Sequence, residues 1–540
     1  MQFSWLDYGI LCIYLALILG VGLWVSRPRP NKNKDASDYF LAGKGLSWWV
    51  IGASLIASNI SAEQFIGMSG SGYAIGMGIA SYEFMAAITL ILVAVFFMPI
   101  FLKMGIYTMP EYLERRYDAR VKTVMAVFWL SVFVFVNLSS ILYLGALTIK
   151  NVLFAGAAVT LLGTSVDPLW IGIVLLGIFS AAYSVYGGLK SVALTDVIQV
   201  VFLIGGGLFT TYIALQHTSD SGSAIDGFSK LLGKAPEKFD MILARDNPQY
   251  TNLPGISVLV GGMWIANLYY WGCNQYIIQR ALAAKSVREA QTGLAFAGVL
   301  KLLLPLIVVI PGIVAFVITN DPKSGHFGEI TKPDAAYPWL LHKFVPSGVK
   351  GLAFAALIAA IVSSLASMMN SISTIFTMDI YRGFFEPGAS ETKLVKVGRI
   401  AAGAALVVSV PVAIALQNLD QAFQFIQEFT GFVSPGALAI FLLGFFTRRA
   451  GANGALLAAL GTFIFSALLK AFVPQLPFLD RMLVVFVLCV IVMLLTPAKN
   501  ADSNTEQLQL EPGTFSTSTG FKLVAVGITA VLTVIYAAWW

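Results

Sequence analysis

Residues 51–72 read IGASLIASNISAEQFIGMSGSG, an apolar run that Ser58, Asn59, Ser61, Glu63 and Gln64 interrupt near its middle. The run is long enough to cross a bilayer, because about 20 helical residues span ~30 Å of hydrocarbon. Polar side chains are costly in lipid, and their cost falls where a spanning helix is broken and its freed carbonyls line a cavity. Packing through small residues explains the glycines, alanines and serines, but not Asn59, Glu63 and Gln64 together. The stretch therefore predicts a broken membrane helix that lines a binding site and coordinates a cation.

The composition of the whole chain is typical of a membrane protein. Of its 540 residues, 58% are hydrophobic and 11% are charged, whereas about 25% are charged in an ordinary soluble domain. The apolar runs are continuous and do not alternate with polar residues, which favours helices over a β-barrel. The expected fold class is an all-α integral membrane protein with about 14 transmembrane helices. The expected spans are residues 6–25, 48–71, 79–101, 123–148, 169–186, 194–215, 256–278, 296–319, 350–378, 396–416, 422–446, 452–472, 480–497 and 521–540.

The order of these spans predicts an internal repeat. Five spans in residues 48–215 are followed by a loop at 216–255 and by five more spans in 256–446. Because five is odd, the second set must cross the membrane in the opposite sense, which is the pattern of an inverted repeat. A first helix with its loop (1–47) precedes the repeats, and three accessory helices with a polar linker (447–540) follow them.

The distribution of charge predicts topology and excludes several classes of protein. Lysine and arginine in the short loops place both the N-terminus and the C-terminus outside the cell. The net charge of +6 is thus explained by topology. No basic patch interleaved with aromatic residues indicates a nucleic-acid partner. The spans contain neither a histidine pair for haem nor a catalytic constellation, so an enzyme or a respiratory subunit is not favoured, and a sensor or channel is favoured still less.

A second polar stretch is typical of an ion site. Residues 359–374 read AAIVSSLASMMNSIST, with Ser363 and Ser364 side by side. Sodium takes about five or six oxygen ligands, which neutral hydroxyls and carbonyls supply. Adjacent serines point about 100° apart, so both contact one ion only if it lies at the helix edge. The alternative, in which these serines bond back to carbonyls four residues earlier, stays open.

Isolated polar residues in other spans are typical of a sugar site. Glu83, Asn267, Lys301 and Gln427 lie in four different spans. An ionisable group within a membrane normally faces a cavity or a partner. Amides and carboxylates near aromatic residues supply the hydroxyl partners and the apolar face that a hexose needs. For Lys301, an alternative is that the ammonium reaches the lipid headgroups instead.

Several longer motifs resemble the sodium:solute symporter family, and within it the bacterial carriers of galactose. They are Asp38 to Lys44 (DYFLAGK), Ser58 to Gly72, Tyr186 to Leu189 (YGGL), Thr195 to Gln199 (TDVIQ), Asn267 to Gly272 (NLYYWG), Gln279-Arg280 and Ile361 to Tyr381. The resemblance extends from the first span to the last. It implies the leucine-transporter fold, with a five-helix inverted repeat and extra helices.

The resemblance also implies roles for particular residues. The sodium ligands would be the carbonyls of Ala57, Ile60 and Ala360 and the hydroxyls of Ser363 and Ser364, with Asp196 as the residue of sodium release. The sugar would contact Gln64, Glu83, Asn267, Tyr270, Lys301 and Gln427. Tyr270 would stack on the sugar as the inner gate, Asn59 would link the broken helix to that gate, and Met68, Tyr82 and Phe423 would close the outer side. The chain departs from the galactose carriers at Ala86, where they have a serine, so that one hydroxyl is missing.

The expected function is sodium-coupled import of a hexose, galactose or glucose, by alternating access, in the inner membrane of a bacterium. Sodium is the co-transported ion, and no organic cofactor is expected. The alternative is a symporter of the same family for an anionic or amino-acid solute such as a carboxylate, sialate or proline. A carboxylate would favour an arginine or an exposed helix N-terminus in the site, whereas Lys301 is the only cation that the sequence places there.

Overall fold

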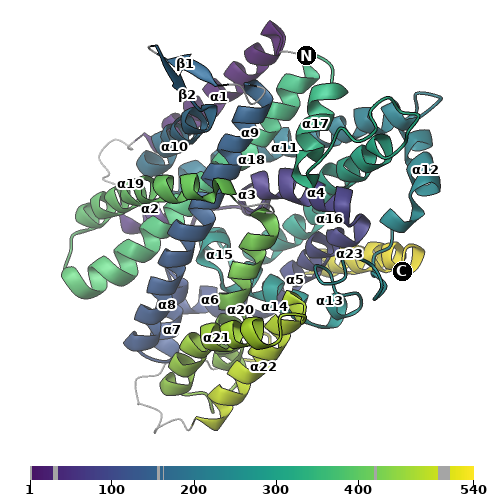
Figure 1. Cartoon of the computed structure of the whole chain (residues 1–540). Helices are drawn as coiled ribbons and strands as arrows, with labels where there is room; N and C mark the ends of the chain where they lie inside the picture. Colours follow the sequence, from purple (N-terminus) through teal and green to yellow (C-terminus); the bar gives the residue numbers. More distant parts are fainter. Residues whose placement is uncertain (1–2, 28–34, 155–157, 162, 419–421, 497–510) are drawn as a thin grey trace.

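The computed structural model describes residues 3–27, 35–154, 158–161, 163–418, 422–496 and 511–540 as a bundle of long helices (Figure 1). Within these ranges, twelve helical segments are long and apolar enough to cross a membrane. They are α1 (Trp5–Ser26), η3 with α5 (Met77–Ala80 and Ser81–Phe96), α8 with η4 and α9 (Ala119–Val132, Phe133–Leu138 and Ser139–Leu153), α10 (Pro168–Gly187), α11 (Leu189–Thr218), α16 (Val287–Thr319), α18 with η8 (Val349–Ile375 and Phe376–Phe385), α19 (Glu391–Ala415), α20 (Ala422–Phe446), α21 (Ala452–Phe472), α22 (Phe478–Leu495) and α23 (Thr519–Ala538). The all-α membrane fold expected from the sequence is confirmed.

The two remaining predicted spans are the ones that the structure divides into pieces. Residues 48–74 form α3 (Trp48–Asn59), the π-helical segment η2 (Glu63–Met68) and α4 (Ser69–Ala74). Residues 257–282 form α13 (Ser257–Val260), α14 (Gly262–Leu268), η6 (Tyr269–Cys273) and α15 (Gln275–Leu282). Each divided segment is the first span of one predicted five-span repeat, and this agrees with the inverted repeat. The boundaries of the two repeats stay predictions. The second of these segments was expected as one continuous span, and that expectation is wrong.

Both breaks have a local cause in the sequence. Ile60 and Asn274 have extended backbones, with ψ of 119° and 118°, and each ends one helix and precedes the next helical segment. After Ile60, the Ser61 N–H donates to Gln64 Oε1 (2.9 Å) instead of continuing the helix. After Cys273, Asn274 Oδ1 accepts from the Tyr276 N–H (3.1 Å) and caps α15. At both breaks an amide side chain therefore accepts a hydrogen bond from a backbone N–H that has no partner within the helix. Polar capping residues do the same at helix ends in general.

Shorter elements connect the spans. They are α2 (Ala36–Phe40), η1 (Ala42–Lys44), α6 (Met98–Met104), α7 (Met109–Arg116), the antiparallel pair β1 (Val159–Leu161) and β2 (Thr164–Val166), α12 (Ala224–Lys234), η5 (Pro236–Lys238), η7 (Pro333–Ala335), α17 (Ala336–Lys343) and η9 (Leu416–Asn418). Within the predicted span 79–101, α5 ends at Phe96 and the separate helix α6 begins at Met98. Pro99 lies in the first turn of α6, because proline is tolerated there and not in a helix interior.

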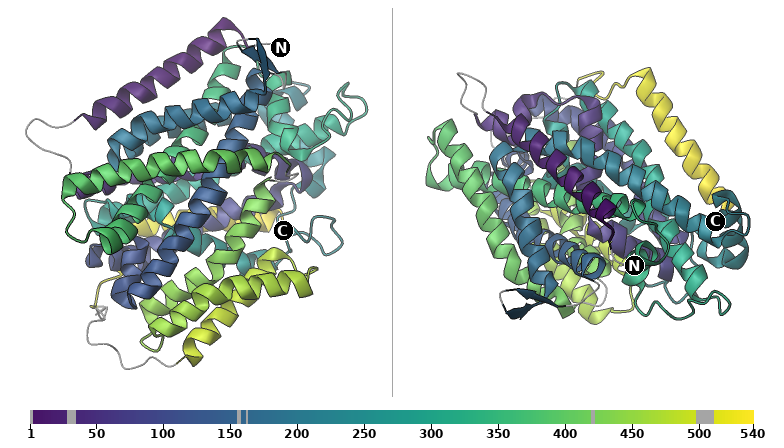
Figure 2. Two further views of the ribbon diagram at one scale, coloured as in Figure 1. Left: turned by 60° about the vertical axis from the view of Figure 1, so that its left-hand side comes forward. Right: turned by 90° about the horizontal axis from the view of Figure 1, so that it is seen from above.

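Burial separates central helices from peripheral ones. In its most apolar window, 94% of Val349–Phe385 is buried, against 17% of α23. α21 and α22 pack on each other and on α20 at one edge of the bundle (Figures 1 and 2). Their outer faces expose apolar side chains such as Leu457, Ile464 and Ile491, which suit lipid. The central helices α16 and α18 pack on α3 and carry the polar residues that the sequence singles out.

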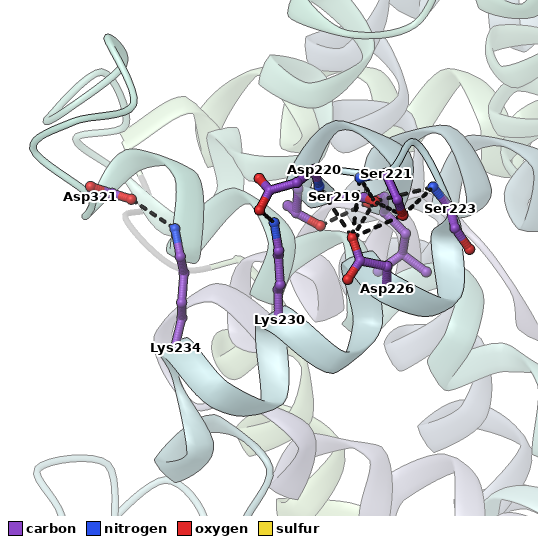
Figure 3. A network of polar contacts seen from close by, with 10 residues as sticks. Ser219, Asp220, Ser221, Ser223, Asp226, Lys230, Lys234 and Asp321 are labelled. Carbon is purple, nitrogen blue, oxygen red and sulfur yellow. Dashed lines mark hydrogen bonds and ion pairs between the residues drawn. The ribbon is translucent and has the colours of Figure 1, made fainter.

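Polar contacts around α12 hold the loop 216–255 together and join it to the second long loop predicted to lie outside, residues 320–349 (Figure 3). The Asp226 carboxylate accepts hydrogen bonds from Ser219 Oγ (2.6 Å) and Ser221 Oγ (3.1 Å). These bonds lower the pKa of Asp226. Lys234 on the same helix forms an ion pair with Asp321 of the second loop (2.9 Å).

Candidate functional site

A cavity lies where the two broken segments meet α5, α16 and α20. All six residues predicted to contact the substrate line it, namely Gln64, Glu83, Asn267, Tyr270, Lys301 and Gln427. Predicted gate residues Asn59, Met68 and Tyr82 line it too. The structure therefore brings together, from five separate parts of the chain, residues that the sequence could place only one span at a time. Their roles in binding stay predictions.

An ion pair lies at the centre of this cavity wall. Lys301 on α16 is 1% exposed, and its ammonium donates to Glu83 Oε2 and Asn59 Oδ1. Asn59 in turn donates through Nδ2 to the Tyr270 hydroxyl (3.1 Å). The ammonium also lies 4.9 Å from the centre of the Trp271 ring. The alternative in which Lys301 reaches the headgroups is wrong, because its charge is already satisfied inside the bundle.

The amides of the cavity keep polar atoms for a ligand. In the described contacts, Gln64 uses Oε1 to accept from Ser61, and Asn267 uses Nδ2 to donate to the Met263 carbonyl (3.1 Å). Gln64 Nε2 and Asn267 Oδ1 thus offer a donor and an acceptor at the cavity wall. A hydroxyl both donates and accepts, so such a pair suits a polyhydroxylated solute.

Other lining residues modify this wall. Ala86 lies on it, so the departure from the galactose carriers falls inside the cavity. Asn137 lines it as well and was not singled out from the sequence, although a lone amide in the apolar span 123–148 was a usable signal. Phe423, predicted to close the outer side, has a side chain outside the described residues. Met68 and Tyr82, also predicted to close the outer side, are 1% and 8% exposed, and their role as a gate stays a prediction.

Ser364, a predicted sodium ligand on α18, contacts the break in residues 48–74, where two other predicted ligands, Ala57 and Ile60, lie. Ser364 Oγ donates to the carbonyls of Ser58 (2.9 Å) and Ile60 (3.1 Å). The Ser61 N–H would bond to the Ala57 carbonyl in a continuous helix, and its diversion to Gln64 frees that carbonyl. Ala57, Ile60, Ala360, Ser363 and Ser364 are all fully buried. The residues fit a sodium ion, because hydroxyl and carbonyl oxygens are the ligands that a hard cation prefers.

Asp196 lies next to this set. Its carboxylate accepts from Ser363 Oγ (2.5 Å) and Ser54 Oγ (2.5 Å). Ser54 also accepts from Arg280 Nε (3.0 Å), and the buried Arg280 donates to Ser367 Oγ. Arg280 was known from the sequence only as part of a motif, and its place beside Asp196 depends on the packing of α15 against α3 and α18.

Comparison with known proteins gives the family. The model of the sodium:solute symporter family matches residues 39–461. The chain belongs to this family. It is 50% identical to the sodium/glucose cotransporter of Vibrio parahaemolyticus, over 99% of this chain and 98% of that protein. It is 34% identical to the human sodium/myo-inositol cotransporter 2, over 83% of this chain and 67% of that protein.

A solved structure agrees with this assignment. A sodium-coupled sialic acid symporter in a substrate-bound, outward-open state matches 93% of this chain and 100% of its own, with a TM-score of 0.78 and 26% identity. The symporter therefore has the leucine-transporter fold, spans the membrane many times and carries sodium as its coupling ion. It is a transporter and not an enzyme.

Proposed function

We propose that the symporter imports a hexose, galactose or glucose, together with sodium by alternating access. The observation that carries this proposal is the cavity wall on which amide donors and acceptors, Tyr270 and Trp271 surround a neutralised Lys301–Glu83 pair. Hydroxyl groups need such mixed donors and acceptors, and the C–H face of a pyranose packs on aromatic rings. The Vibrio relative, named for glucose, supports the same substrate class.

The alternative substrate is an anion or an amino acid, as in the sialic acid symporter. A carboxylate needs an unpaired cation. In this cavity Glu83 already neutralises Lys301, and Arg280 lies beside Asp196 and is not part of the lining. The lining also holds the carboxyl of Glu63, so the described wall offers no unpaired cation for an anion and favours a neutral solute.

The energy for import comes from the sodium gradient and the membrane potential. An inward positive charge gains about 2.3 kcal/mol per 100 mV, and each tenfold sodium gradient adds about 1.4 kcal/mol. One sodium ion per sugar would then support accumulation of roughly several hundredfold.

The deciding experiment is uptake of labelled solutes into proteoliposomes with and without a sodium gradient. Galactose, glucose, myo-inositol, proline and sialic acid form the panel. We expect sodium-dependent uptake of galactose or glucose, and Ala86→Ser to change the preference between them because it adds a hydroxyl to the cavity wall. Uptake restricted to proline or sialic acid would support the alternative and reject the proposal.

Two amides provide a sharper prediction about the sugar site. Gln64→Ala and Asn267→Ala should each lower sugar uptake at least tenfold while the protein still inserts and folds, since each removes about one hydrogen bond to the solute. Gln64→Ala also removes the acceptor for Ser61, so Gln64→Glu, which keeps Oε1, separates the two effects. Uptake equal to that of the parent in both alanine variants would remove these residues from the site.

Orientation is a further part of the proposal. The lysine and arginine bias of the short loops places both termini outside the inner membrane of a bacterium. In a variant without Cys12, Cys273 and Cys489, new cysteines at Asn33 and Asp502 should be protected from an impermeant reagent in intact cells, and one at Ser221 should react. The reverse pattern would invert the topology.

A further inference from the structure

Lys238 binds the end of the broken helix segment that lines the cavity. Its ammonium donates to the carbonyls of Tyr73 (3.1 Å) and Ala74 (2.8 Å), the last two residues of α4. Lys238 belongs to η5 in the loop predicted to lie outside, and it is 9% exposed. The contact therefore joins residues that are 164 positions apart in the chain.

The surroundings of Lys238 favour this contact. The last carbonyls of a helix have no partner within the helix and carry partial negative charge, so an ammonium satisfies them. The Phe316 ring lies beneath the ammonium, 4.0 Å from its centre. Burial lowers the pKa of Lys238, so its desolvation must be offset by these partners. Gly76 has a φ of 101°, and a Cβ there would lie 2.3 Å from the Lys238 carbonyl oxygen, so only glycine permits this approach.

The loop that carries Lys238 is itself anchored on the end of α23. The Met241 N–H donates to the Trp539 carbonyl (2.8 Å), and the Phe239 ring lies 6.2 Å from the ring of Trp539. On its other side, Phe239 packs edge-on against Phe228 of α12 (5.7 Å). Both Phe239 and Met241 are buried, at 2% and 1% exposed. Residues 236–241 are thus held from two sides, independently of α4.

The segment that Lys238 binds is the one that carries the predicted outer gate. η2 and α4 are continuous in sequence from Glu63 to Ala74. Gln64 and Met68 therefore lie on the same short helical segment that Lys238 contacts at its end. We propose that residues 236–241, anchored on α23, form an outer strap that holds α4 where the outer side of the cavity is closed, with Lys238 as a positioning residue. This rests on the alternating access of the proposed function.

The expected effect has a definite sign. Met68 and Tyr82, which the sequence predicts for the outer gate, are buried here, so the proposal assigns the bonds of Lys238 to the outward-closed state. The proposal requires that opening the outer side moves residues 63–74 away from their packed position and breaks these bonds. A contact made in one state only shifts the equilibrium toward that state. Its removal must therefore increase the outward-open population, whereas damage to the fold would lower every activity together.

The test measures how fast an outer gate cysteine reacts from outside. Met68→Cys is made in the variant without the three native cysteines, and intact cells are treated with an impermeant thiol reagent in sodium without sugar. We expect added Lys238→Met to raise the labelling rate about tenfold, as the loss of one or two charge-assisted hydrogen bonds predicts. The sodium concentration for half-maximal uptake, measured without the Met68 substitution, should fall. Lys238→Arg, which keeps the charge and donors, should restore the parental values.

The chain offers matched controls. Lys234→Met removes an outer-loop lysine that is paired with Asp321 and not with α4, so labelling should not change (Figure 3). Removal of Trp539 and Trp540 deletes the anchor of the strap and should also raise the labelling rate of the cysteine at position 68. If Lys238→Met does not fold, this truncated variant tests the proposal in its place. A labelling rate equal to or below that of the parent, in folded protein, would overturn the strap. Because sugar is absent, this outcome is independent of which sugar is carried, and a cysteine at Ser221 checks that the loop is outside.

Discussion

Ser364→Ala should raise the sodium concentration for half-maximal uptake by about tenfold, which corresponds to about 1.4 kcal/mol. The Ser364 hydroxyl lies within 3.1 Å of the Ile60 carbonyl and 2.9 Å of the Ser58 carbonyl, at the break where helix carbonyls are freed. Deleting it removes about one of five ligands from a weakly held ion. The readout is the rate of sugar uptake into proteoliposomes, measured at a fixed sugar concentration over a range of sodium concentrations.

Sugar affinity should respond through linkage. A ligand shifts the access equilibrium only by its different affinity for the two states, so a weaker ion site also weakens apparent sugar affinity at fixed sodium. This loss should largely disappear at saturating sodium, because the sugar contacts are intact.

Ser371→Ala is the matched control for this prediction. Ser371 lies on the same helix two turns away, and its hydroxyl donates to Gln279 Oε1 and the Ser367 carbonyl (both 3.1 Å). It should leave the sodium dependence unchanged. If Ser364→Ala also has the sodium dependence of the parent, the serines are packing residues and the ion site must be sought elsewhere, first at Asp196.

The fold was predictable from the sequence because lipid imposes a strong and local constraint. Each span must be apolar over about 20 residues, so its ends can be placed without knowing its neighbours. The break in residues 48–74 was also predictable, since Asn59, Glu63 and Gln64 are too polar for a continuous helix in lipid. The break at Asn274 was missed because Trp271, Gly272 and Cys273 preserve an apolar run, and the single amide that caps α15 gives only a weak signal.

The partners of the polar residues were not predictable in the same way. Membership of the cavity follows from residue type, because a polar side chain in a span normally faces a cavity or a partner. The pairing of Lys301 with Glu83 joins positions 218 residues apart, and it depends on how α16 packs against α5. No local pattern contains that information. The same holds for Arg280 beside Asp196 and for Lys238 on α4.

The second large effect concerns that ion pair. Lys301→Met should reduce sugar uptake more than a hundredfold and also lower thermal stability, because it leaves the Glu83 carboxylate buried without its cation. Breaking a buried pair by removing one partner typically costs about 3–5 kcal/mol. Uptake in proteoliposomes and thermal unfolding in detergent measure the two effects separately.

The double variant Glu83→Gln with Lys301→Met distinguishes a structural pair from a substrate site. It removes both charges, so most of the lost stability should return, since a buried pair replaced by neutral groups is often nearly neutral in energy. Sugar uptake should stay low, because the ammonium and the carboxylate that would bind hydroxyls are both gone. Full recovery of uptake in the double variant would show that the pair only holds α5 against α16. In that case the sugar would be bound by the amides Gln64, Asn267 and Gln427 alone, and Asn59 would link the broken helix to Tyr270 without the contact to Lys301 that the structure shows.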